Sequence, residues 1–309
     1  MQEDSLTGLS GVSKAIDITN KRISQYAASD SEILIQGETG VGKSRCAKLI
    51  HQLSMRSKGP FVEINCGSIP CSLIESELFG HEKGAFTGAV KNHIGFIKRA
   101  NKGTLFLDEI GDMPLEVQGH LLHFLESKEV HSLGSDCNET VDCRVIAATN
   151  EALDTLMANG DFRQDLFYRL NVLPLAIPSL RERTSDIELL ANSFLEQELL
   201  KSGIEALTLS DASITVLRHH PWPGNIRELK NVIKRAVVLA TGSVIEPEAL
   251  GIDMVCDFRT VDHNQLASKH IEKVIRDHKY NMTASARYLN ISRPTLYRLI
   301  KKHKLELDS

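Results

Sequence analysis

The run Gly37-Glu-Thr-Gly-Val-Gly-Lys-Ser44 constrains the fold of this 309-residue chain more than any other feature. It follows a short β-rich run at residues 31–36 and precedes residues 45–51, whose apolar spacing is helical. Strand, glycine loop and helix, in that order, form the context in which this pattern binds phosphate groups. Glycines let the backbone N–H groups turn inward, where they and the helix N-terminus receive negative charge. The alternative is a glycine-rich turn that binds nothing.

The same loop predicts the roles of two side chains. Lys43 would supply a cation to the β- and γ-phosphates of a nucleotide, and the hydroxyl of Ser44 would bind Mg²⁺. The residues expected to line the phosphate site are Gly37, Glu38, Thr39, Gly40, Val41, Gly42, Lys43 and Ser44.

Three further apolar runs, at residues 60–65, 103–108 and 142–150, also end in polar residues. Helical patterns lie between these runs. Strands that alternate with helices favour an α/β fold with a mostly parallel sheet, whose ligands lie at the carboxyl ends of its strands. We therefore expect the polar residues at these ends to meet around one site.

Two adjacent carboxylates, Asp108 and Glu109, follow the run that begins at residue 103. Neighbouring residues of an extended chain point opposite ways, so the two carboxylates can have different roles. Asp108 would hold Mg²⁺ through water, and Glu109 would orient the water that attacks the γ-phosphate. The alternative is a strand end capped by solvated acids. Beside a phosphate loop, the pair favours nucleotide hydrolysis over nucleotide binding alone.

Charge is distributed unevenly along the chain. The whole sequence has 36 Lys and Arg against 40 Asp and Glu, a net charge of −4. Residues 264–309 contain ten basic and four acidic residues, a balance of +6, which leaves −10 for residues 1–263. A basic piece on an acidic body indicates two kinds of partner, and the basic piece is the candidate for nucleic acid.

Residues 283–302 read as two short helices joined by a tight turn, with Ser292 as the N-cap of the second helix and Pro294 in its first turn. Leu296 and Ile300 would fix this helix to a core, which leaves its other face for the major groove of double-stranded DNA. The alternative is a basic amphipathic helix that only aids solubility. The residues predicted to contact DNA are Arg293, Thr295, Arg298, Lys301 and Lys302.

The apolar stretches are far shorter than the ~20 residues that span a bilayer, and the acidic N-terminus is unlike a signal peptide. The six cysteines have no metal-like spacing, so we expect reduced thiols. These features predict a cytoplasmic protein without a membrane span.

Residues 77–89, Glu-Leu-Phe-Gly-His-Glu-Lys-Gly-Ala-Phe-Thr-Gly-Ala, carry a resemblance to a known family. Their last six residues form the GAFTGA signature, and the chain therefore resembles the bacterial enhancer-binding proteins, the AAA+ activators of sigma-54 RNA polymerase. The resemblance covers about residues 8–240 and is followed by a Fis-like helix-turn-helix. It continues through the runs at residues 103–110, 162–171, 178–183 and 222–229.

The resemblance implies the fold and the order of its parts. It predicts an AAA+ P-loop ATPase with a parallel sheet and a helical lid, plus a small all-α Fis-type helix-turn-helix domain. The expected parts are an α/β ATPase subdomain at residues 1–177, a lid at 178–245, a linker at 246–263 and a DNA-binding domain at 264–309.

The resemblance also assigns roles to residues outside the phosphate loop. Asn65 would hold the catalytic Glu109 away from water until a partner is engaged. Thr149 and Asn150 would sense the γ-phosphate, Arg227 would act from the lid, and Arg163 and Arg169 would reach the nucleotide of a neighbouring subunit. Taken alone, these arginines would read as surface charges and Asn65 as a turn or capping residue.

The GAFTGA segment is expected to contact sigma-54 through Gly84, Ala85, Phe86, Thr87, Gly88 and Ala89. Two glycines relax the backbone on either side of Phe86 and Thr87, so an aromatic side chain can lie at a loop tip. The alternative is that Phe86 packs internally, as aromatic residues often do.

Together these features predict an ATP- and Mg²⁺-dependent bacterial activator that binds upstream enhancer-like DNA and remodels the closed complex of sigma-54 RNA polymerase. The resemblance implies a hexameric ring, either of this chain alone or shared with a paralogous co-activator. Because no receiver domain is found, we expect a single-component activator of the phage-shock or type III secretion kind, acting at the nucleoid under a separate negative regulator. Two alternatives are an AAA+ loader that does not act on sigma-54 and a DNA-binding regulator with a vestigial ATPase.

Overall fold

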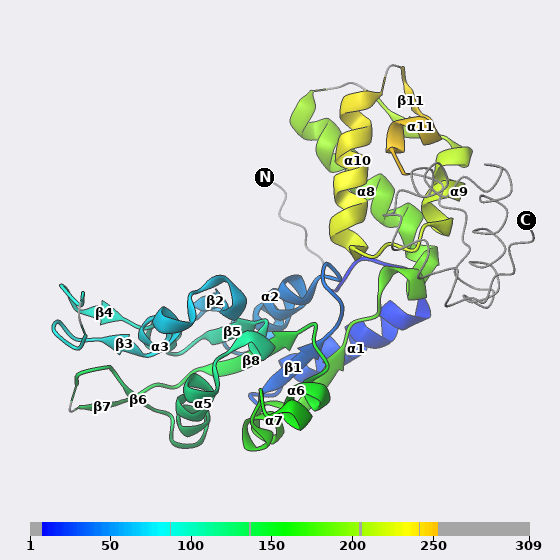
Figure 1. Ribbon diagram of the computed structural model, residues 1–309. Helices are drawn as coiled ribbons and strands as arrows, with labels where there is room; N and C mark the ends of the chain where they lie inside the picture. The colour runs from blue at the N-terminus through cyan, green and yellow to red at the C-terminus, as the bar shows by residue number, and fades with distance from the viewer. Residues whose placement is uncertain (1–7, 87, 136, 204–205, 241, 253–309) are drawn as a thin grey trace, which may run out of the picture. The chain divides into compact units, whose positions relative to one another are not determined.

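The core of the ATPase part is a five-stranded parallel sheet in the order β2-β5-β8-β1-β9 (Figure 1). The computed structural model describes residues 8–86, 88–135, 137–203, 206–240 and 242–252. The strands are β1 Ile33–Gln36, β2 Phe61–Asn65, β5 Thr104–Asp108, β8 Arg144–Thr149 and β9 Leu173–Ala176. The α/β class and the parallel sheet expected from the sequence are confirmed.

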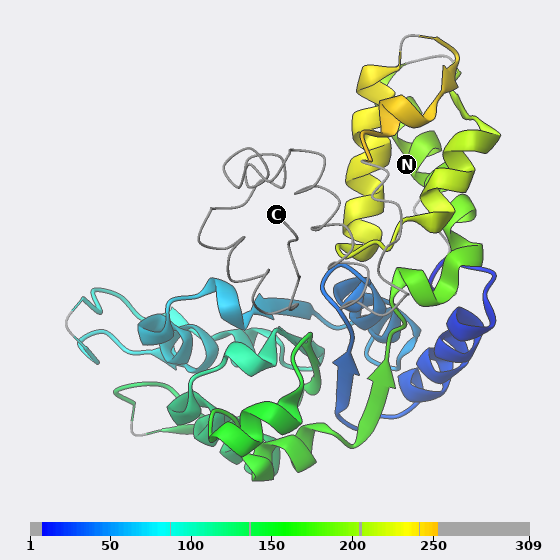
Figure 2. The same cartoon turned by 45° about the vertical axis from the view of Figure 1, so that its right-hand side comes forward.

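Helices cover both faces of this sheet. They are α1 Lys14–Ala27, α2 Lys43–Leu53, α3 Cys71–Phe79, α4 Phe96–Arg99, α5 Leu115–Ser127, α6 Leu153–Asn159 and α7 Gln164–Leu170, with short 3₁₀ turns η1 Cys66–Ser68 and η2 Ile110–Asp112. Figure 2 shows α1 (dark blue) beside α2 on the same side of the sheet.

The period-two alternation of the strands explains the two faces. Leu105 and Leu107 pack into a buried cluster with α3, α5 and α7. Phe106, between them, packs into a separate cluster with α1 and α2. Both faces are therefore apolar, as a sheet covered on both sides requires.

Strand β9 was not expected, because the proline in its sequence Leu173-Pro-Leu-Ala argues against a central strand. It lies at the sheet edge, paired with β1 only. There a residue without an N–H is tolerated, and the carbonyl of Pro174 accepts a hydrogen bond from the Tyr26 hydroxyl at 3.1 Å.

Two small hairpins extend from the sheet. Strands β3 Gly80–His81 and β4 His93–Ile94 pair antiparallel, as do β6 Glu129–His131 and β7 Asn138–Thr140. The first hairpin carries the GAFTGA segment between its strands.

The lid is a helical bundle with its own core around the buried Trp222, whose Nε1 donates to the Leu217 carbonyl at 2.8 Å. Its elements are η3 Leu180–Asp186, α8 Ile187–Ser202, β10 Thr208–Leu209, α9 Asp211–His219, α10 Asn225–Leu239, β11 Val244–Ile245 and α11 Pro247–Leu250. Leu250 is buried in the lid core, so packing continues past residue 245, where a linker was expected. A four-residue helix is too short to give a periodic signal in the sequence.

Among the helices in the described ranges, none has the length and apolar character to cross a membrane. The predicted DNA-contacting residues and Thr87 lie outside the described residues.

Candidate functional site

The glycine loop joins β1 to α2 as predicted. Gly40 and Gly42 have φ of +82° and +104°, values that side-chain-bearing residues rarely adopt, and α2 begins at Lys43. Lys43 is 6% exposed, and its Nζ donates to the Gly37 carbonyl at 3.1 Å. A buried ammonium group at the start of a helix is suited to binding phosphate groups.

The acid pair lies directly beside this loop. Lys43 Nζ is 3.3 Å from Glu109 Oε1, and the Ser44 hydroxyl donates to Asp108 Oδ2 at 3.4 Å. Burial, and next the charge of Glu109, raise the pKa of Asp108 above its usual value. A hydroxyl and a carboxylate are the hard oxygen donors that Mg²⁺ takes, and a cation would relieve the repulsion between the carboxylates. Ser44 and Asp108 therefore fit the expected ion.

Glu109 is held by backbone geometry and by the end of a neighbouring strand. Its φ is +52°, and its Oε2 accepts from the Asn150 N–H at 3.1 Å. The Asn150 side chain donates to Thr39 Oγ1 at 3.3 Å, while the buried Thr149 hydroxyl accepts from Glu151 N–H at 3.0 Å. Of the two predicted sensors, Asn150 thus contacts the phosphate loop and Thr149 supports the following turn.

Asn65 ends β2 in register with Asp108, at the same edge of the sheet. Its Oδ1 accepts from the Ser68 N–H at 2.9 Å, and its carbonyl accepts from the Ser68 hydroxyl at 2.8 Å. The expected hold of Asn65 on Glu109 is therefore not made in this conformation. Asn65 instead caps the 3₁₀ turn that follows it. This is the capping role expected for Asn65 when it is considered without the family resemblance.

Two cavities adjoin the loop. The smaller, of about 180 Å³, is lined by Thr39, Gly40, Gly42, Lys43, Ser44, Arg45, Asp108, Glu109 and Arg227. The larger, of about 810 Å³, shares Gly40, Gly42, Arg45 and Arg227 with it and extends between the N-terminal segment and the lid. The smaller cavity fits phosphates, and the larger is of the size that holds a small organic ligand such as a nucleoside.

The lid is joined to the phosphate loop by a fully buried asparagine that sequence reasoning missed. Asn225 Nδ2 donates to Glu38 Oε2 at 3.1 Å and to the Thr39 carbonyl at 3.0 Å. Its Oδ1 accepts from Leu180 N–H at 2.8 Å. Asn225 lies within residues 222–229, one of the runs that carry the family resemblance. Its role, however, depends on a contact across more than 180 positions of sequence.

Two further lid residues approach the loop. Arg181 forms a two-point ion pair with Glu38, and this guanidinium is the main cause that lowers the pKa of that carboxyl. Arg227, the predicted lid arginine, lines both cavities, and its N–H donates to the Gly40 carbonyl at 3.3 Å. The lid therefore closes the site through Glu38 and Gly40 together.

Arg163 and Arg169 lie apart from this site. Arg163 pairs with Asp165 at 2.7 Å, and Arg169 donates to the Leu125 carbonyl at 2.9 Å. Within one chain the structure does not bring them to the nucleotide cavities.

The GAFTGA loop has two glycines in the left-handed region, Gly84 at φ +91° and Gly88 at +112°, and a Cβ at either would point into open space. Phe86 is 39% exposed and packs edge-on against the His81 ring, with 4.9 Å between centroids. The Phe86 side chain is therefore partly exposed to solvent and partly packed against His81. Ala89 is buried and its N–H donates to the Phe86 carbonyl at 3.0 Å.

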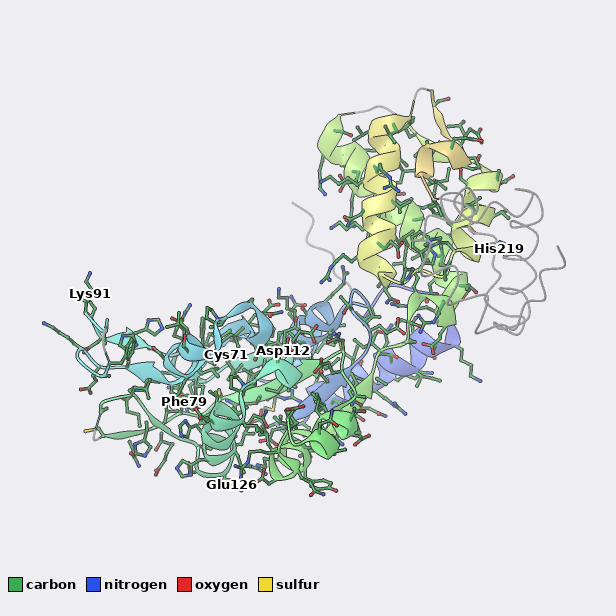
Figure 3. All side chains as sticks on the ribbon, viewed as in Figure 1. Cys71, Phe79, Lys91, Asp112, Glu126 and His219 are labelled. Atoms are coloured by element: carbon green, nitrogen blue, oxygen red, sulfur yellow. The ribbon has the colours of Figure 1, made fainter. Side chains whose placement is uncertain are left out.

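A backbone connection ties the root of this loop to the second hairpin. Leu133 N–H donates to the Gly80 carbonyl, and Glu82 N–H donates to the Leu133 carbonyl, both at 2.9 Å. In Figure 3, Phe79 marks this root and Lys91 lies at the far end of the segment.

Comparison with known proteins agrees with this geometry. The family model described as the Sigma-54 interaction domain matches residues 9–176. The AAA+ ATPase lid domain matches residues 181–266, and the Bacterial regulatory protein, Fis family, matches residues 266–303.

Two curated relatives and one solved structure illustrate the similarity. The chain is 42% identical over 93% of its length to Regulatory protein AtoC of Escherichia coli and 41% identical over 96% to the alginate biosynthesis regulator AlgB of Pseudomonas aeruginosa. It spans 65% and 68% of their respective lengths. The crystal structure of NtrX from Brucella abortus in complex with ATP is 30% identical, with a TM-score of 0.74 over 96% of this chain and 69% of that one. Because the sigma-54 interaction model matches more than half of its residues, the chain belongs to the family of proteins that carry the AAA+ sigma-54 interaction domain.

Proposed function

We propose that this protein is an ATP-hydrolysing transcriptional activator of sigma-54 RNA polymerase that binds upstream DNA through its C-terminal domain. One observation carries the proposal: a GAFTGA loop with a partly exposed phenylalanine belongs to the same domain as a complete phosphate loop and acid pair. An AAA+ loader would need the second feature but not the first.

The nucleotide step follows from the contacts of Lys43. Its ammonium group lies 3.3 Å from Glu109 Oε1. We infer that the γ-phosphate draws Lys43 away, which frees Glu109 to accept a proton from the attacking water. Mg²⁺ at Ser44 and Asp108 would supply the positive charge that offsets the phosphates. Asn150, which contacts both Glu109 and Thr39, would report whether the γ-phosphate is present.

The chain is proposed to act as a ring. Arg163 and Arg169 are 45% and 39% exposed, which supports their availability to a neighbouring subunit's nucleotide. A guanidinium supplied in trans accelerates phosphoryl transfer by ~10³–10⁵ in other NTPases. Hexamer formation, with or without a co-activator subunit, would then control hydrolysis.

The match of residues 266–303 to the Fis-family model supports DNA as a partner. We propose that Arg293, Thr295, Arg298, Lys301 and Lys302 hold the protein on double-stranded DNA, so that it acts at the nucleoid in the cytoplasm. A separate regulator protein would control it.

The proposal is tested on a sigma-54 promoter in a purified system. With ATP and Mg²⁺ the protein should open the closed complex of the sigma-54 holoenzyme and should have no effect on the housekeeping holoenzyme. Failure to open the promoter at saturating ATP would refute the proposed function.

Thr87→Ala sharpens this test. We expect open-complex formation to fall to background while ATP hydrolysis stays within about twofold of wild type, because the described residues of the GAFTGA segment line neither nucleotide cavity. Permanganate footprinting and phosphate release measure the two activities. Thr155→Ala, at an exposed position of α6, is the matched control. Equal loss of both activities in Thr87→Ala would contradict the proposal that the GAFTGA segment engages sigma-54 and is not needed for ATP hydrolysis.

A further inference from the structure

One wall of the larger cavity comes from the segment of residues 8–11, which precedes α1. Asn20 fixes this wall from below: its Oδ1 accepts from Leu9 N–H at 2.7 Å, and its Nδ2 donates to the Leu9 carbonyl at 3.0 Å. Both backbone polar groups of Leu9 are thereby occupied.

Asp186 fixes the other end of the same segment. It is 0% exposed and accepts three hydrogen bonds, from Val12 N–H at 2.6 Å, Ser13 N–H at 2.7 Å and the Ser13 hydroxyl at 2.7 Å. A Cβ on Gly11 would come within 2.5 Å of Asp186 Oδ2, so the backbone lies directly against the carboxylate. All three bonds are short, as expected for bonds to a charged acceptor.

Asp186 lies at the junction of η3 and α8, so its hydrogen bonds also connect residues 12 and 13 to α8. It is the last residue of η3 and precedes α8, and Leu190, Phe194 and Gln197 of α8 line the same cavity. Figure 1 shows α1 beside the chain that leads into α8. Asp186 therefore ties the wall of residues 8–11 to the wall that α8 supplies, and it sets the distance between them.

The smaller cavity, which we call the phosphate half of the site, is formed without the hydrogen bonds of Asp186. Lys43, Ser44 and Asp108 are held by β1, α2 and β5, and their side-chain hydrogen bonds go to Gly37, to Glu109 and to one another. The lid reaches the phosphate loop through Asn225, through the ion pair of Arg181 with Glu38 and through Arg183, whose Nη2 donates to the Val41 carbonyl at 3.4 Å. Asp186 takes part in none of these hydrogen bonds. A change at Asp186 should therefore act on one half of the ligand only.

We infer that Asp186 is a positioning residue for the nucleoside: through Val12 and Ser13 it holds the wall against which the base lies, and so it sets affinity for the base without touching the phosphates. This inference rests on the proposed nucleotide-binding function. The ligand part concerned is a purine nucleoside, the part of ATP left over once the smaller cavity has taken the phosphates.

Equilibrium titration of the full chain with two probes tests the inference. A non-hydrolysable ATP analogue reports both halves of the site, whereas inorganic tripolyphosphate reports the phosphate half alone. We expect Asp186→Ala to weaken binding of the analogue about tenfold, because three donors lose their buried acceptor and the wall is released. Binding of tripolyphosphate should stay within about twofold of wild type, since its partners are unchanged.

Two further variants separate positioning from folding. Asp186→Asn keeps an oxygen for the two N–H groups, and its amide can donate to the Ser13 hydroxyl, so binding should recover to within about twofold of wild type. Ser13→Ala removes one of the three bonds, together with the bond that its hydroxyl accepts from Ile16 N–H at the start of α1, and it should weaken the analogue about threefold. Asp17→Asn, an exposed acid on α1 paired with Lys21, is the matched control and should change neither probe.

Equal weakening of both probes, or wild-type affinity of Asp186→Ala for the analogue, would overturn the inference. If Asp186→Ala does not fold, the same comparison of the two probes is made with Ser13→Ala, and equal weakening or unchanged affinity there would overturn it as well. The readout needs neither hydrolysis nor sigma-54, so failure to activate a promoter would count against the proposed function alone. A wild-type chain that bound no ATP analogue would overturn both.

Discussion

The two cavities of the nucleotide site are built on different principles. The smaller cavity, of about 180 Å³, is formed largely by one glycine loop and one strand end, and it concentrates a lysine, a hydroxyl and two carboxylates. The larger, of about 810 Å³, is formed by segments from the N-terminus, the phosphate loop, α8 and α10. Charge dominates the first cavity, whereas the packing of distant segments determines the second.

This difference determines which changes each cavity tolerates. In the smaller cavity a single side chain carries much of the interaction with the ligand, so its removal should be felt at once. The larger cavity is lined by residues from several distant segments, so we expect residues outside its lining, such as Asp186, to affect its shape as well. Two substitutions test this contrast, and a third, at an acid that lies away from both cavities, gives the comparison.

Lys43→Ala should have the largest effect. Loss of the buried ammonium group should weaken both the ATP analogue and tripolyphosphate by at least about 100-fold, because both probes depend on the phosphate half. Titration calorimetry measures both affinities. Lys48→Ala, an exposed lysine on α2 that pairs with Glu63, is the control. A variant that still bound tripolyphosphate would show that the cavities are not divided as described.

Asn225→Ala should have an intermediate effect, on stability as well as on binding. It removes two hydrogen bonds from the lid to the phosphate loop and one within the lid, from Leu180 N–H, and it places alanine at φ +52°. We expect the free energy of unfolding to fall by about 2–4 kcal/mol. Urea unfolding measures this change.

Asn225→Gly loses the same hydrogen bonds but has no backbone strain at this φ. It should therefore be more stable than Asn225→Ala by about 1 kcal/mol. The exposed Asn159→Ala on α6 should cost little. If Asn225→Ala were as stable as Asn159→Ala, the buried connection would contribute nothing.

Asp142→Asn should have the smallest effect, because this acid lies away from both cavities. Its hydrogen bond with Arg56, and next that with Lys102, lower the pKa of Asp142 to about 2. A lowered carboxyl pKa stabilises the fold above the unfolded value of about 3.9, and this contribution is lost as the pH falls through about 2. At 49% exposure solvent screens the pair, so the loss at pH 7 should stay below about 1 kcal/mol.

Thermal unfolding of the wild type and of Asp142→Asn between pH 2 and 7 measures this difference in stability. The two proteins should differ most above about pH 4 and converge below it. A constant difference across this range would exclude ionisation of Asp142 as the cause.

The phosphate half of the site was predictable from sequence, because the residues of the phosphate loop are contiguous and Asp108 and Glu109 are adjacent. The structure brings Lys43, Ser44, Asp108 and Glu109 together as the motifs suggested. The proline in β9 and the shortness of α11 hid two elements that only tertiary packing stabilises.

The contacts that join distant segments around the site could not be predicted in this way. Asp186 binds Val12 across 174 positions of sequence and Asn225 binds Glu38 across 187, and no local pattern encodes such distances. For Asn65 the motif indicated a partner for Glu109, whereas local hydrogen bonding with Ser68 decides its position here. Side chains that compete between a local cap and a distant partner are ambiguous in sequence.

The connection between the GAFTGA loop and the second hairpin is made by main-chain atoms of Leu133 on both sides. Its strength is therefore independent of which side chain stands at position 133, proline excepted, since proline alone lacks the donor. An alanine at this position would keep both hydrogen bonds, whereas a proline would lose the N–H that binds the Gly80 carbonyl. A comparison of the two substitutions would therefore separate the backbone anchor from the packing of the side chain.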